Sequence, residues 1–160
     1  MLAASAYEIV LAVHVMAVVV AFGVTFAYPV MFAVAARHDP RALPLLHRIE
    51  YTTERILVNG GLLVVVAAGI FLASDGHHWS EFFVQWGLGV AVVIGASVGS
   101  VMIPTAKRAE AAATHDIVAA GDGEVALGGE YQALVRRLQI VGSALSLLVL
   151  VTILFMVVKP

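Results

Sequence analysis

A single histidine, His14, stands in the apolar stretch LAVHVMAVVVAFG near the start of the chain. It is the one side chain between Ile9 and Ala36 that titrates near neutral pH. A neutral imidazole is an axial ligand for haem iron and a common ligand for copper or zinc. The same ring can instead act only as a hydrogen-bonding group between two helices. Both interpretations of His14 stay open at the level of sequence.

The surroundings of His14 on a helix are small or polar. Its face continues through Ala17, Val18, Ala21, Thr25 and Tyr28. Small residues leave room for a flat macrocycle or for another helix to approach closely. A second ligand would come from His77 or His78, or from another subunit, although these two histidines can equally belong to an ordinary polar loop. Met16 points about 200° away from His14 at about 100° per residue, so the two share no helical face.

A second polar group lies further along the chain. His47, Glu50, Tyr51 and Glu54 share one helical face, and a neighbouring stripe consists of Arg48, Thr52, Arg55 and Asn59. The spacing predicts glutamate–arginine pairing at the start of a helix near a membrane surface. The same group could bind a propionate, a phospholipid headgroup or the loop of a partner.

The composition indicates an integral membrane protein. Apolar residues make up 61% of the 160 residues and charged residues 12%, against about 25% in soluble proteins. The net charge of −2 argues against nucleic acid as a partner. Cysteine is absent, so disulfides, thiolate metal sites and cysteine nucleophiles are excluded.

Four stretches without Asp, Glu, Lys or Arg are long enough to cross a bilayer, namely Ile9–Ala36, Ile56–Ser74, Phe82–Ala106 and Leu138–Val158. Backbone groups in lipid must be satisfied internally, so these stretches are predicted to be helical. The expected fold is all-α, an up-down four-helix membrane bundle in one domain over residues 1–160. Its helices are expected at about 7–36, 44–74, 81–108 and 131–158.

Basic residues predict the orientation of the bundle. They gather in two connections, as Arg37, Arg41, Arg48 and Arg55 and as Lys107, Arg108, Arg136 and Arg137. By the positive-inside rule both connections are cytoplasmic. Both termini and the Asp75–Glu81 connection are then expected on the non-cytoplasmic side of a plasma membrane, such as a bacterial inner membrane.

The two halves of the chain resemble each other. Residues 30–37 (VMFAVAAR) and 101–108 (VMIPTAKR) end the first and third helices, and residues 55–61 (RILVNGG) and 137–143 (RLQIVGS) open the second and fourth. Short matches arise by chance among membrane helices, because these helices are built mainly from a few apolar residue types. If the repeat is real, two similar hairpins are related by a pseudo-two-fold axis along the membrane normal.

These features together resemble known membrane proteins. LAVHVMAVVVAFG is similar to the first-helix opening of HemJ-type protoporphyrinogen oxidases and CopD-like copper-resistance proteins. FAYPVMF and TTERILVNGG are similar to the HemJ motifs YLPRLF and MERRL. In length and in its overall pattern of apolar helices the chain resembles an uncharacterised family of small four-helix integral membrane proteins. The HemJ resemblance implies a haem or porphyrin site with His14 as axial ligand.

The sequence departs from the HemJ pattern at the groups expected to handle porphyrinogen. Phe22 replaces a tryptophan, Val30 replaces an arginine, and the nearest counterpart of a third-helix lysine is Gln85. The resemblance therefore implies cofactor binding rather than the oxidase reaction. The candidate cofactor-binding residues are His14, Tyr28, Gln85 and Arg55, and the candidate metal ligands are His14, His77 and His78.

Three functional classes follow. The first is a redox-associated protein that binds haem b or copper through His14. The second is a non-enzymatic accessory or assembly subunit of a larger membrane complex, or a homo-oligomer in the bilayer. The third is a small transporter, which the parallel repeat suggests. No hydrolase motif is present, and the sequence leaves open whether the protein is an enzyme.

Overall fold

The computed structural model describes residues 5–159, and in this part of the chain every regular element is a helix. The elements are α1 (Ala6–Phe22), α2 (Tyr28–His38), α3 (Leu43–Thr53), α4 (Asn59–Asp75), α5 (Phe82–Ser97), α6 (Ile103–Ala120) and α7 (Gly129–Val158). They join into four stretches long and apolar enough to cross a membrane: Ala6–His38, Pro40–Asp75, Phe82–Ala120 and Gly129–Val158. We call these the first to fourth spans. The prediction of an all-helical protein with four such helices is confirmed.

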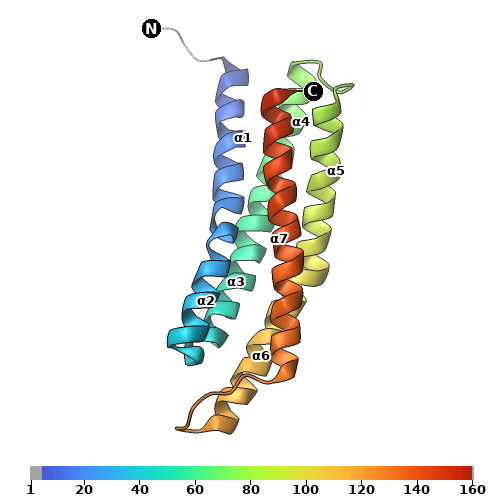
Figure 1. The fold of residues 1–160 in the computed structure, drawn as a ribbon. Coiled ribbons are helices and arrows are strands. Elements are labelled where there is room, and N and C mark those ends of the chain that lie inside the picture. Colours follow the sequence, from blue (N-terminus) through green and yellow to red (C-terminus); the bar gives the residue numbers. More distant parts are fainter. Residues whose placement is uncertain (1–4, 160) are drawn as a thin grey trace.

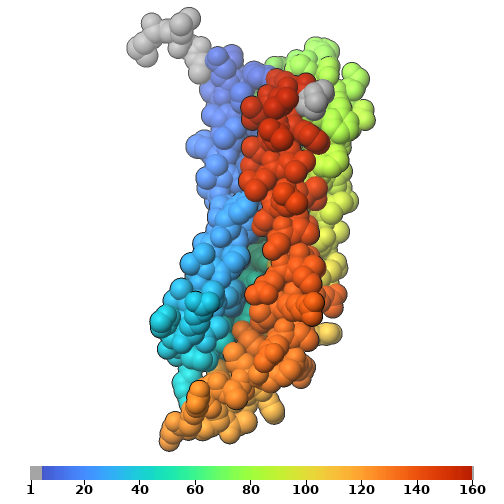
Figure 2. All heavy atoms as spheres, viewed as in Figure 1, coloured from blue at the N-terminus to red at the C-terminus, as the bar shows by residue number. Residues whose placement is uncertain are grey.

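The spans lie side by side, as Figure 1 shows. The start of α1, the end of α7 and the turn between α4 and α5 lie at one end of the molecule, here called the terminal end. The connections from α2 to α3 and from α6 to α7 lie at the opposite end, called the loop end. In the space-filling view of Figure 2 the first and fourth spans flank a hollow at mid-height, through which the second span is visible.

Three of the spans contain an interruption of regular α-helix. A 3₁₀ turn at Gly23–Phe26 precedes Pro29, and a π-helical turn at Val98–Met102 precedes Pro104. Proline lacks an N–H and its ring clashes with the carbonyl four residues earlier, which accounts for both breaks. The second span also contains a π-helical turn, Glu54–Val58. This turn has no proline in it or directly after it. Such turns occur frequently at functional sites.

The third span is longer than the sequence predicts. It continues through Ala120 instead of ending near residue 108, because an alanine-rich stretch sustains the helix beyond the basic pair Lys107–Arg108. The connection that follows is fixed by polar contacts. Asp116 accepts a hydrogen bond from the Gly128 N–H (2.8 Å), and the Arg41 guanidinium donates to the Gly121 and Gly123 carbonyls (2.6 and 3.0 Å).

Two apolar clusters form the core. The cluster nearer the terminal end joins all four spans and contains Ala21, Phe22, Val58, Leu62, Val90, Ile94, Val98 and Val149. The cluster nearer the loop end contains Ala35, Leu43, Met102, Ala106, Ala109, Ala113, Tyr131 and Leu138. In the second cluster three alanines of α6 are fully buried. Small side chains there let α3 and α6 pack closely.

A close approach of backbones that requires a glycine lies between α1 and α4. A Cβ at Gly61 would lie 2.6 Å from the Ala21 Cβ and 3.3 Å from the Ala21 Cα. The adjacent Gly60 faces open space, with no atom within 4 Å of the corresponding position. Gly61 is therefore needed for the approach of these helices, whereas Gly60 is not.

The two glycines provide a matched test of this packing. We expect Gly61→Ala to lower stability by about 1–3 kcal/mol, because the added methyl group forces α1 away from α4. We expect Gly60→Ala to leave stability unchanged or slightly higher, because alanine is the better helix former. Thermal unfolding of both purified variants in the same detergent measures the difference. Equal midpoints for the two variants would contradict the contact.

Candidate functional site

His14 projects from α1 onto α4. Its Nδ1–H donates a hydrogen bond to the Val65 carbonyl oxygen at 2.9 Å. A Cβ at Gly69 would lie 3.4 Å from the imidazole Cε1, so the ring rests in the recess that this glycine leaves. With Nδ1 engaged, Nε2 is the ring nitrogen with no hydrogen-bond partner among residues 5–159. His14 is therefore both a contact between two helices and a potential ligand.

The small residues below His14 do not leave room for a macrocycle. Ala17 and Ala21 face Gly61 of α4, with the Ala17 carbonyl 3.7 Å and the Ala21 Cβ 2.6 Å from a Cβ built there. Of the two alternatives open from sequence, close approach of another helix is the one that occurs at this face. Space for a ligand lies beside His14 instead.

A cavity of about 520 Å³ adjoins His14 at the terminal end of the molecule. Its walls come from α1, α4, α5 and α7 and are mostly aliphatic or aromatic. The volume falls within the range of roughly 300–1,000 Å³ that is typical of small-molecule sites. The polar side chains in its lining are Tyr7, His14, His78, Trp79, Thr152 and Lys159.

Two further side chains with metal-ligating atoms line this cavity. His78 comes from the turn after α4, where its ring lies over Gly76 and near Phe83, with ring centroids 6.0 Å apart. Met156 comes from α7 and reaches across to Gly87 of α5. Imidazole and thioether groups are both axial ligands of haem iron. His78 is among the residues that the sequence predicts for the site, whereas Met156 is not, because nothing in the sequence relates α7 to α1.

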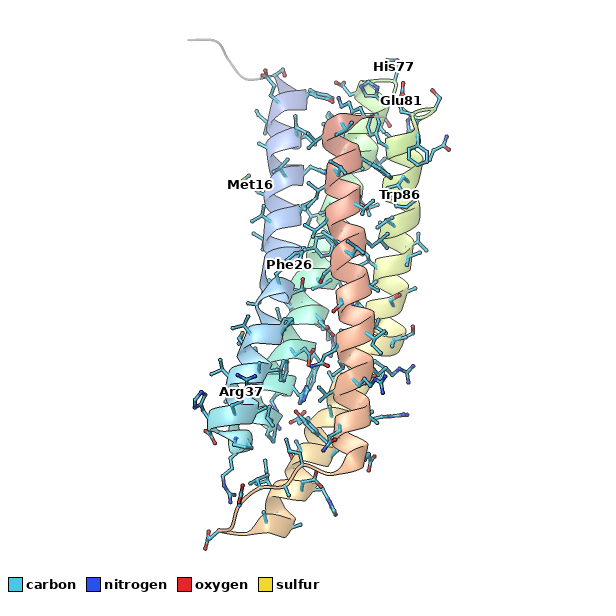
Figure 3. The ribbon with its side chains drawn as sticks, viewed as in Figure 1. Met16, Phe26, Arg37, His77, Glu81 and Trp86 are labelled. Atoms are coloured by element: carbon cyan, nitrogen blue, oxygen red, sulfur yellow. The ribbon has the colours of Figure 1, made fainter. Side chains whose placement is uncertain are left out.

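The other residues predicted for the site lie elsewhere. Gln85 is exposed and donates to the Trp79 carbonyl at 3.4 Å, and Arg55 is exposed on the π-helical turn of the second span. Tyr28 is buried, but it lies beyond the break in the first span and outside the lining of the cavity. Figure 3 shows His77 at the tip of the terminal end and Met16 pointing away from the bundle.

A second polar cluster is buried nearer the loop end. The His47 Nδ1–H donates to the Glu50 carboxylate at 2.9 Å, and His47 Nε2 lies 3.2 Å from the Tyr131 hydroxyl. The His47 ring also packs on Phe32, with centroids 4.5 Å apart. These contacts join α2, α3 and α7 and leave His47 and Glu50 only 1% and 4% exposed. Both ring nitrogens of His47 and the Glu50 Oε2 therefore have a partner inside the protein.

Glu54 lies in the same region without such a partner. It is 3% exposed, and its Oε2 is buried with no hydrogen-bond partner among the described residues. The Tyr28 hydroxyl is buried and unpartnered in the same way. Both groups are close enough to Glu50 to interact electrostatically with its carboxylate.

The predicted pairing of these glutamates with arginines does not occur. Arg48 instead pairs with Glu110 of α6 at 2.6 Å, and Lys107 lies 5.4 Å from the centre of the Tyr51 ring. The glutamates turn inward and the basic residues outward. The spacing of His47, Glu50 and Glu54 did contain this signal, but the expected position near a membrane surface favoured an exposed interpretation.

The fold and these sites define a class, a small multi-pass helical membrane protein with polar groups buried between its spans. Comparison of the chain with family models, with curated proteins and with solved structures finds no match.

Proposed function

We propose that the protein binds a haem, or a comparable flat and largely apolar metal cofactor, in the cavity beside His14. The observation that carries the proposal is the hydrogen bond from His14 Nδ1–H to the Val65 carbonyl. Histidines that ligate metals almost always donate their other ring N–H to such an acceptor, which fixes the tautomer and orients the free nitrogen. Nε2 is then the ligating atom.

The chemistry of the cavity favours haem over a bare copper ion. Residues 5–159 hold no group of three or more His, Cys, Asp or Glu side chains arranged to bind a metal ion. Haem needs only one or two axial ligands and gains affinity from apolar walls. His14 would provide one ligand and His78 or Met156 the other. Lys159, which lines the cavity, would pair with a propionate. A bound haem would supply one-electron redox chemistry.

The absorbance spectrum of the purified protein tests this function. We expect a Soret band after expression with sufficient haem supply, and we expect His14→Ala to lose most of it, since the axial nitrogen is removed. His115→Ala is the matched control, because His115 is exposed on α6 and does not line the cavity. That variant should retain the wild-type spectrum.

A colourless wild-type protein that also fails to take up added haemin would contradict the proposal. An equal Soret band in His14→Ala and wild type would contradict the role of His14 in particular. Variants of His78 and Met156 then identify the second ligand by the change in band position.

We also propose an up-down arrangement with both termini on the non-cytoplasmic side. Most of the basic residues in the connections belong to the segments at the loop end, including Arg37, Arg41 and Lys107. Basic connections remain in the cytoplasm by the positive-inside rule. The cavity beside His14 then lies in the outer half of the membrane and the Glu54 region in the inner half.

The absence of cysteine allows a direct test of this orientation. We expect His77→Cys in intact cells to react with a membrane-impermeant maleimide, because the α4–α5 turn is exposed to the outside. Asp122→Cys, in the exposed connection before α7, should react only after the membrane is permeabilised. The reverse pattern would invert the proposed orientation.

A further inference from the structure

The region around Glu54 places two carboxyl groups close together in the interior of the bundle. Glu50 and Glu54 are one helical turn apart on the same face, at 4% and 3% exposure. The Glu50 carboxylate accepts a hydrogen bond from the His47 imidazole at 2.9 Å. Glu54 has neither a cation nor a hydrogen-bond donor at Oε2. An ionised carboxylate buried in this way is very costly unless it is paired.

The groups that surround Glu54 offer no compensating charge. The turn Glu54–Val58 packs against α1 and the turn Val98–Met102, and the adjoining α3 packs against α2 and α6. Tyr131 of α7 lies beside His47. The titratable groups they direct inward are Tyr28 and Tyr131, and α6 contributes the buried hydroxyl of Thr105. The nearby cations are engaged at the surface, Arg48 with Glu110 and Lys107 over the Tyr51 ring. The titratable groups of α1, including His14, lie towards the terminal end.

From this geometry we infer a proton-binding site in which Glu54 holds the proton at neutral pH and Glu50 remains hydrogen-bonded to His47. Two neighbouring carboxyl groups share one bound proton in preference to carrying two charges. The alternative occupant, a metal ion, requires several ligands at one point, and no such group of side chains exists among residues 5–159. The unpartnered Tyr28 hydroxyl beside the pair provides a further donor or acceptor for the exchanging proton.

The inferred site is separate from the cavity beside His14. Neither Glu50 nor Glu54 lines that cavity. The inference therefore does not depend on haem binding. It assigns to the inner half of the bundle an exchangeable proton, which is the feature that intramembrane carboxyls of proton-coupled proteins have in common.

Infrared spectroscopy of the full-length protein in lipid nanodiscs tests the inference. At pH 7 the wild type should show a C=O stretching band of a protonated carboxylic acid, well separated from the carboxylate bands. Glu54→Gln should lose this band while keeping its fold, because glutamine has the shape of a protonated glutamate. Glu130→Gln, which alters an exposed glutamate in the first turn of α7, is the matched control and should keep the band.

A second variant keeps the test decisive. In Glu50→Gln the charge next to Glu54 is removed. The protonated-acid band of Glu54 should therefore disappear at the same pH as in wild type or at a lower pH. Absence of the band in wild type at pH 7 would overturn the inference. So would its disappearance when choline is replaced by sodium at constant pH, since a metal ion would then be the occupant. A band that survives unchanged in Glu54→Gln would assign the proton to another group.

Discussion

The close approach of α1 to α4 is the constraint on which the half of the bundle nearer the terminal end depends. Gly61 admits the Ala21 methyl, and two turns further along the same pair of helices Gly69 admits the His14 ring. Between these glycines the Val65 carbonyl accepts the His14 N–H. One row of small residues on α4 therefore determines the helix spacing, the orientation of the imidazole and the position of its free nitrogen. A wider spacing would remove all three.

Lipid surroundings make the unsatisfied polar atoms informative. Backbone and side-chain polar groups in a bilayer must find partners within the protein, and those of His47, Glu50, Trp86 and Thr152 do so. The exceptions in the described part of the chain are the buried Tyr28 hydroxyl and Glu54 Oε2, to which we add the unbonded Nε2 of His14. These are the atoms at which we propose that a cofactor or a proton binds.

The sequence predicts the helices well and the sites only partly. Uncharged apolar runs specify the spans, because length and hydropathy are local properties, and Pro29 and Pro104 account for two of the interruptions. It also identifies His14 as the one group between Ile9 and Ala36 that titrates near neutral pH. It does not show that α4 covers the face of Ala17 and Ala21, or that Gln85 and Arg55 point away, since both depend on helix rotation. Rotation is decided by packing between spans distant in sequence.

The central claim is that His14 is a neutral imidazole with its proton on Nδ1 and a free Nε2 directed towards a ligand. Solid-state ¹⁵N NMR of histidine-labelled protein in lipid, with His14→Ala to assign the signals, measures this protonation directly. The account predicts a protonated Nδ1 and an unprotonated Nε2, with the Nε2 signal alone changing strongly when haemin is added. A proton on Nε2, or signals from both nitrogens that do not respond to haemin, would contradict it.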